Sequence, residues 1–151
     1  MIKVYFETTI FNRFLENNRE YSIETKSLFE KILKNEIEAY SSTYVIEELD
    51  KASEPKRTEM LNLIQKYRIS VLEIDQRAYD LSEIYVEMGI IPIKYRIDGI
   101  HIAMAAIYNM DCIVSLNFRH INKLKTKMAT EIVHHMKGYS NPFICTPMEV
   151  L

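Results

Sequence analysis

Short β-rich runs alternate with helical patterns along the whole chain, and this alternation limits the fold more than any other feature. Five such runs occur, at residues 2–6, 37–41, 69–74, 112–115 and 143–146. Between them, apolar residues recur every three or four positions, which is typical of amphipathic helices. Strands separated by helices favour right-handed crossovers and a parallel sheet covered on both faces. We therefore predict an α/β fold with three layers, α/β/α, around a central, mostly parallel sheet of about five strands.

Several residues mark where helices should begin and end. Ser42 or Thr43 and, further along, Asp75 are suitable N-caps. Gly89 can adopt the left-handed conformation that stops a helix. Residues 98–108 predict a buried helix, because isoleucines and alanines occupy most of its positions.

Length and composition fit an ordinary globular protein. A chain of 151 residues predicts one domain, residues 1–151, and its contents of 48% hydrophobic and 26% charged residues are typical of that class. No apolar run approaches the roughly 20 residues of a membrane helix, and the N-terminus has no secretory pattern. We therefore expect a cytoplasmic protein with no membrane contact, in which Cys112 and Cys145 are buried thiols.

The charge distribution gives only weak evidence for nucleic acid binding. The formal net charge is −2, which provides no general attraction to phosphates. The region after residue 118 is locally basic and carries Arg119, Lys123, Lys125, Lys127 and Lys137 against the single acid Glu131. These side chains can contact phosphates, and a solvated helix face accounts for them nearly as well.

Polar residues follow the predicted strands at the edge where parallel sheets bind their ligands. Four separate segments supply them: Glu7 after the first strand, Glu47 and Glu48 one turn after the second, Asp98 at the start of the buried helix, and Ser115 and Asn117 at the end of the fourth strand. Carboxylate and amide oxygens suit hard cations such as Mg²⁺ or Mn²⁺. Crowded carboxylates also repel one another unless a proton or a cation intervenes. The sequence therefore predicts a divalent-metal site at this edge.

The same residues resemble the four motifs of PIN domains. The matching stretches are Val4-Tyr5-Phe6-Glu7-Thr8-Thr9, Tyr44-Val45-Ile46-Glu47-Glu48-Leu49, Asp98-Gly99-Ile100-His101-Ile102-Ala103-Met104-Ala105 and Ile113-Val114-Ser115-Leu116-Asn117-Phe118. They occur in the family's order and extend the resemblance over about residues 2–147. Two positions depart from the pattern, because Glu7 and Asn117 stand where the family more often has Asp. The resemblance implies a PIN-like fold.

The resemblance also implies an activity. Many PIN domains are Mg²⁺- or Mn²⁺-dependent ribonucleases that cut single-stranded RNA, and many are toxins of bacterial toxin–antitoxin pairs. By this resemblance Glu7, Glu48 and Asp98 would coordinate the metal, with Glu48 rather than Glu47 as the ligand. The substitution of Asn117 for Asp removes one charge from the site and should lower its affinity for metal.

Other residues of these motifs would support the reaction. By the resemblance, Asn117 would assist catalysis through its side-chain oxygen or a water, and Ser115 would orient a water or a neighbouring carboxylate. Thr8, beside Glu7 in the first motif, would support the same site. Arg119 and His120 follow directly at the rim, where they are candidate phosphate contacts.

Three classes of function remain open from the sequence. The first is the ribonuclease, with an antitoxin as a partner that blocks the site and a homodimer formed through helices 22–36 and 55–67. The second is a PIN-like module that has lost catalysis and binds RNA or a protein. The third, a small-molecule phosphohydrolase, would need an aspartyl nucleophile after the first strand, where this chain has Glu7.

Simpler structural roles also account for some of these residues. Asp98 can cap its own helix, and Asn117 can shape the turn after the strand. His101 fits a core histidine that makes one hydrogen bond. His134 and His135 lie side by side on a basic helix, which indicates a surface position for both.

Overall fold

The central sheet contains five parallel strands, as predicted. The computed structural model describes residues 1–151, and its strands are β1 (Ile2–Phe6), β2 (Ile37–Ser42), β3 (Ser70–Leu72), β4 (Cys112–Val114) and β5 (Phe143–Cys145). Their order in the sheet is β3-β2-β1-β4-β5. Strand β1 lies in the middle, where Tyr5 pairs with Tyr40 of β2 and with Ile113 of β4. The carboxyl ends of β2, β1 and β4 are therefore neighbours at one edge.

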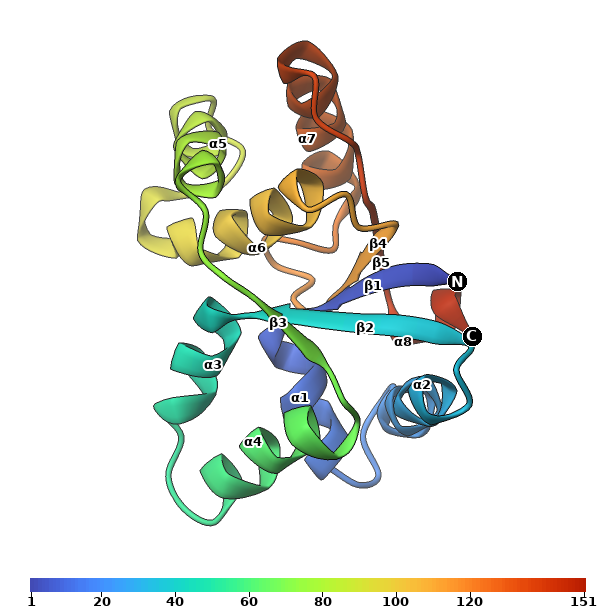
Figure 1. Ribbon diagram of the computed structural model, residues 1–151. Helices are drawn as coiled ribbons and strands as arrows, with labels where there is room; N and C mark the ends of the chain where they lie inside the picture. Colours follow the sequence, from blue (N-terminus) through green and yellow to red (C-terminus); the bar gives the residue numbers. More distant parts are fainter.

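Helices cover both faces of the sheet and form the three layers (Figure 1). One face carries α5 (Gln76–Glu87), α6 (Arg96–Ile107) and α7 (Leu124–Lys137), and the other carries α1 (Thr8–Leu15), α2 (Ser22–Leu33), α3 (Thr43–Asp50), α4 (Lys56–Lys66) and α8 (Pro147–Val150). A short 3-10 helix, η1 (Ile93–Tyr95), leads into α6. No helix is both long enough and apolar enough to span a bilayer.

The predicted helix boundaries are confirmed at three positions. Ser42 caps α3, because its Oγ accepts a hydrogen bond from the backbone N–H of Val45 at 3.3 Å. Asp75 caps α5 through the N–H of Arg77 at 2.8 Å. Gly89 follows the end of α5 with φ +72°, a conformation that glycine adopts without steric cost. These residues fix where α3 and α5 begin and where α5 ends.

Other predicted boundaries and positions are wrong. Helix α6 begins at Arg96, so Asp98 lies in its first turn and is not its N-cap. The helices η1 and α8 were not predicted, because neither is long enough to show a periodicity. His134 is buried, with only 1% exposed, whereas His135 is exposed as expected. Burial of His134 is tolerated because its two ring nitrogens bond the hydroxyl of Tyr85 and the side chain of Asn141.

A cluster of aromatic rings packs α1, α2 and the end of α4 against the sheet. Phe29 of α2 lies at its centre, with ring centroids 5.2 Å from Phe6, 5.9 Å from Phe11, 4.7 Å from Phe14 and 5.0 Å from Tyr67. Most of these pairs meet edge to face, the geometry that aromatic quadrupoles favour. The cluster belongs to a core of 35 buried apolar residues. It fixes the position of α1, the helix that starts directly after Glu7.

Replacing the central ring should destabilise the fold strongly. Phe29→Ala should lower the free energy of unfolding by about 3–5 kcal/mol, because the side chain is fully buried and leaves a cavity. Phe143→Ala is the matched control, since that ring is 74% exposed and its loss should cost under about 0.5 kcal/mol. Urea unfolding followed by circular dichroism measures both. Equal losses in the two variants would contradict this description of the core.

Candidate functional site

The predicted site residues lie at the carboxyl edge of the sheet. Glu7 directly follows β1, and α3 with Glu48 starts directly after β2. Ser115 directly follows β4. Because β1 lies between β2 and β4, these three chain segments are brought together at one edge. The first turn of α6, with Asp98, supplies the fourth segment.

Glu7 is a carboxylate buried at the end of the central strand, with only 3% exposed. Its Oε1 accepts hydrogen bonds from the hydroxyls of Thr9 and Ser115, both at 2.6 Å. Burial raises the pKa of Glu7, and this effect exceeds the lowering by His101 and by the two hydroxyls. Its other oxygen, Oε2, accepts no hydrogen bond from the protein. The site therefore holds a carboxylate whose charge is costly to bury and whose second oxygen is not bound by the protein.

Glu48 is the more accessible carboxylate, with 32% of its side chain exposed. Its Oε1 accepts hydrogen bonds from the hydroxyl of Thr8 at 2.9 Å and from Nε2 of His101 at 2.5 Å. Burial alone would raise the pKa of Glu48, but the hydrogen bonds and the charge of His101 outweigh it and lower this pKa. The side chain is therefore ionised at neutral pH. Its neighbour Glu47 is exposed.

His101 lies between the acidic residues and is fully buried. Its Nδ1 is 2.8 Å from the hydroxyl of Tyr5, and its Nε2 bonds Glu48. Burial lowers the pKa of His101, but the carboxylates of Glu48, Glu7 and Asp98 together raise it above its usual value. All three acids thus act electrostatically on one imidazole ring.

Asp98 and the loop after β4 form a second hydrogen-bonded group. Oδ2 of Asp98 is 3.0 Å from Nδ1 of His120, a ring that is only 9% exposed and lies against Tyr95 at a centroid distance of 4.3 Å. Oδ1 of Asn117 accepts a hydrogen bond from the backbone N–H of His120 at 3.0 Å. The N–H of Asn117 in turn donates to Oγ of Ser115 at 3.0 Å. This loop therefore connects Asp98 to Glu7 through Ser115.

Cations border the same part of the edge. Arg119 is exposed, and its guanidinium lies 6.0 Å from the ring centroid of Tyr95. Nζ of Lys94, on η1, lies 5.7 Å from the same ring. Neither side chain forms an ion pair with an acidic group of the protein. Both are therefore free to meet an anion in solvent.

The sequence reasoning missed part of the site. Thr9 was not assigned a role, although it donates to Glu7. The prediction for His101 is correct about burial but wrong about a single hydrogen bond, because the ring bridges Tyr5 and Glu48. One signal was available: His101 follows Asp98 by three residues and shares its helix face.

The donor atoms suit a hard cation, but they do not form a closed cage. Glu7, Glu48 and Asp98 each have one carboxylate oxygen that accepts no hydrogen bond from the protein. No three or more His, Cys, Asp or Glu side chains lie close enough together to hold a metal ion as they stand. Mg²⁺ usually keeps several waters and binds only one or two carboxylates. The arrangement therefore fits an ion held by one or two of these acids and completed by water.

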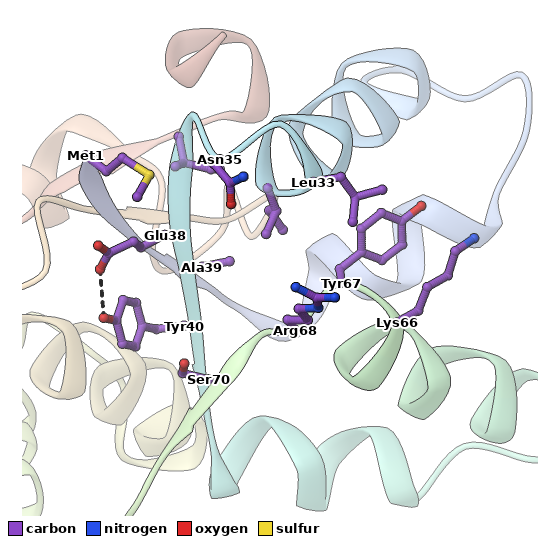
Figure 2. A pocket seen from close by; sticks show the side chains of 12 residues that line it. Met1, Leu33, Asn35, Glu38, Ala39, Tyr40, Lys66, Tyr67, Arg68 and Ser70 are labelled. Atoms are coloured by element: carbon purple, nitrogen blue, oxygen red, sulfur yellow. Dashed lines mark hydrogen bonds between the residues drawn. The ribbon is translucent and has the colours of Figure 1, made fainter.

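A hollow at the opposite edge of the sheet lies away from these residues. It has a volume of about 410 Å³ and is formed by Met1, by β2 and the first residue of β3, and by the ends of α2 and α4. Figure 2 shows its lining, which includes Met1, Glu38, Tyr67 and Arg68. None of the predicted site residues lines it. We therefore identify the candidate site by its chemistry and not by volume.

Comparison with known proteins identifies the fold. No protein-family model and no curated protein matches the chain. Among solved structures, it is similar to a chain in VapBC2 from Rickettsia felis bound to a DNA fragment from their promoter, with a TM-score of 0.63, 14% identity, and coverage of 96% of this chain and 98% of that chain. It is also similar to a chain in DNA-bound VapBC from Salmonella typhimurium, with a TM-score of 0.52, 14% identity, and coverage of 97% and 99%. The chain thus has the PIN-domain fold that its four motifs predict.

Proposed function

We propose that this protein is a Mg²⁺- or Mn²⁺-dependent endoribonuclease that cuts single-stranded RNA. The observation that carries the proposal is the buried carboxylate of Glu7. Its ionised form is disfavoured by burial and by the charge of Glu48, and its Oε2 has no protein partner. A bound cation would relieve both costs. The PIN-like fold, shared with chains of the VapBC structures, supports the proposal, because the resemblance of the four motifs to PIN domains implies a metal-dependent ribonuclease.

The acidic residues of the site would bind the ion, and neighbouring hydroxyls hold two of them in place. One or two of Glu7, Glu48 and Asp98 would hold it directly, through the oxygens that the protein leaves free, and the others would act through bound water. A divalent ion there polarises a phosphate ester and lowers the pKa of a bound water. Ser115 holds the Glu7 carboxylate and Thr8 holds that of Glu48, so both acids are restrained by a hydroxyl donor.

The loop after β4 would meet the RNA backbone. Arg119 is the candidate phosphate contact that solvent reaches most easily. His120 is largely buried and uses Nδ1 on Asp98, so only its Nε2 remains for a phosphate. Asn117 uses its side-chain oxygen on the N–H of His120. Its NH₂ group is therefore the part that could assist catalysis through a water.

We propose a protein antitoxin as the partner, a toxin's role in a toxin–antitoxin pair, and a cytoplasmic location. The support is the presence of VapB with VapC in both similar structures. A homodimer through residues 22–36 and 55–67 remains part of the proposal. Helix α2 exposes Ile23 and Leu33 on that surface, whereas α4 exposes no large hydrophobic side chain.

The competing proposal is a module that binds RNA or a protein without cutting. The arrangement of the acids favours it, because no three of them lie close enough to hold an ion together. Binding and cleavage of single-stranded RNA, measured on the same protein preparation, distinguish the two proposals. RNA that is bound but left intact in the presence of Mn²⁺ would favour the binding module.

RNA cleavage should require Asp98 and a divalent ion. Asp98→Asn keeps the shape of the side chain but removes its charge, so the rate of cutting a labelled single-stranded RNA with Mn²⁺ should fall at least roughly 100-fold. EDTA should stop the wild-type reaction. Asp80→Asn, at an exposed position of α5, is the control and should cut like the wild type. Cleavage that survives both Asp98→Asn and EDTA would exclude the metal mechanism.

RNA binding should depend on Arg119 through its charge. Each phosphate contact with single-stranded nucleic acid adds about 0.7 to the slope of log affinity against log salt. Arg119→Ala should reduce this slope by about 0.7 in fluorescence anisotropy titrations performed with Ca²⁺ in place of Mn²⁺. Arg77→Ala, whose side chain is paired with Asp75, should leave the slope unchanged. An unaltered slope for Arg119→Ala would remove this residue from the phosphate contacts.

Metal-free protein should gain stability when Glu7 loses its charge. The folded-state pKa of Glu7 is raised, so the folded protein binds the proton more tightly than the unfolded chain does. The free energy of unfolding therefore falls as the pH rises from the pKa of the unfolded chain through the higher pKa of the folded protein. Glu7→Gln should therefore unfold at higher urea than the wild type at pH 8 in EDTA, and the difference should shrink toward pH 4.

With Mn²⁺ in place of EDTA, the wild type should become more stable than Glu7→Gln. Binding to the folded wild type raises its stability by mass action, whereas Glu7→Gln, with fewer charges, should gain less. A wild type that is already more stable than Glu7→Gln at pH 8 in EDTA would contradict the proposed cost of this carboxylate.

A further inference from the structure

A buried series of hydrogen bonds runs from the sheet to Glu48. The hydroxyl of Tyr5 is 2.7 Å from Oγ of Ser42 and 2.8 Å from Nδ1 of His101. Nε2 of His101 is 2.5 Å from Oε1 of Glu48. Ser42, Tyr5 and His101 are fully buried, so water does not compete for these bonds. This series of hydrogen bonds links β2, β1, α6 and α3 in that order.

An ionised carboxylate only accepts, so Nε2 of His101 donates to Glu48. The Tyr5 hydroxyl can donate to Nδ1 of the neutral ring or accept from the N–H at Nδ1 of the protonated ring, so it satisfies this nitrogen in either state. Oγ of Ser42 accepts a hydrogen bond from the N–H of Val45 and also bonds the Tyr5 hydroxyl. Tyr5 is therefore the partner that satisfies Nδ1 of His101 while Nε2 donates to Glu48.

We propose that Tyr5 is a positioning residue that, through His101, fixes the carboxylate of Glu48 for its ligand. The inference rests on the proposed function of the site. His101 and Thr8 both hold Oε1 of Glu48, which leaves Oε2 oriented and unpartnered. Without the Tyr5 hydroxyl, Nδ1 of His101 would be a buried polar atom with no hydrogen-bond partner, and the ring would turn to find one. Glu48 would then lose its fixed donor.

The molecule contains a matched pair that serves as a control. The hydroxyl of Tyr85 bonds Nε2 of His134, and both side chains are buried. Nδ1 of His134 bonds the side-chain oxygen of Asn141 and no carboxylate. Tyr85→Phe therefore removes the same kind of buried bond as Tyr5→Phe, but on α5 and α7 and not beside an acid of the site.

The test compares Tyr5→Phe with Tyr85→Phe in the full chain. Electron paramagnetic resonance measures free Mn²⁺ and so yields the affinity of the protein for Mn²⁺. The ring ¹⁵N shifts of His101 report the hydrogen bond at Nδ1. Tyr5→Phe should bind Mn²⁺ about tenfold more weakly, the usual cost of losing a residue that holds a metal ligand, and should move the Nδ1 shift of His101. Tyr85→Phe should alter neither quantity.

The outcomes separate this inference from the proposed function. A folded Tyr5→Phe that binds Mn²⁺ as tightly as the wild type would overturn the inference while leaving the proposed function intact. A wild type that binds no Mn²⁺ would overturn the proposed function. The His101 shifts alone would then decide the inference, and unchanged shifts in Tyr5→Phe would overturn it.

A second pair of variants applies if Tyr5→Phe does not fold. His101→Gln retains an amide that donates to Glu48, whereas His101→Leu retains no donor. We expect the Gln variant to bind Mn²⁺ about tenfold more tightly than the Leu variant, the lower end of the effect of losing a residue that supports a metal ligand. Equal affinities would overturn the positioning role.

Discussion

Burial of the Glu7 carboxylate is the constraint on which the rest of the site depends. A charge at the end of the central strand, with almost no exposed surface, needs hydrogen-bond donors or a counter-charge. Thr9 supplies one donor because α1 starts directly after β1, and Ser115 supplies another because β4 ends beside Glu7. These donors satisfy one oxygen only. The other oxygen has no protein donor, so a divalent ion at the edge of the sheet could bind it and offset the buried charge.

The parallel sheet turns distant chain segments into neighbours around this carboxylate. The order β3-β2-β1-β4-β5 puts β1 between β2 and β4, so the three ends meet without any long loop. His101, on α6, then joins the acids electrostatically, because Glu48, Glu7 and Asp98 all act on its ring. The site is thus prepared by side chains that are mostly buried, whereas the group proposed to meet RNA, Arg119, is exposed.

Local chemistry could be predicted from the sequence, and long-range contacts could not. The alternation of strands and helices, the caps at Ser42 and Asp75, and the PIN-like fold follow from patterns within one segment or from the order of motifs. The link from Tyr5 to His101 depends on how α6 packs on β1, which no local pattern encodes. His134 was misplaced for the same reason, since adjacent histidines look alike until α5 and α7 pack together. The side-chain directions that keep the acids from forming a closed cage are likewise set by their hydrogen bonds, as with Asp98 and His120.

The central claim is that this acidic edge binds a divalent ion, and anomalous scattering tests it most directly. Crystals soaked in Mn²⁺ and measured near the manganese absorption edge locate the ion without reference to activity. The account predicts an anomalous peak within coordination distance of Oε2 of Glu7 or Oε2 of Glu48, completed by waters. Absence of a peak at these acids under saturating Mn²⁺, or a peak only elsewhere on the molecule, would contradict it.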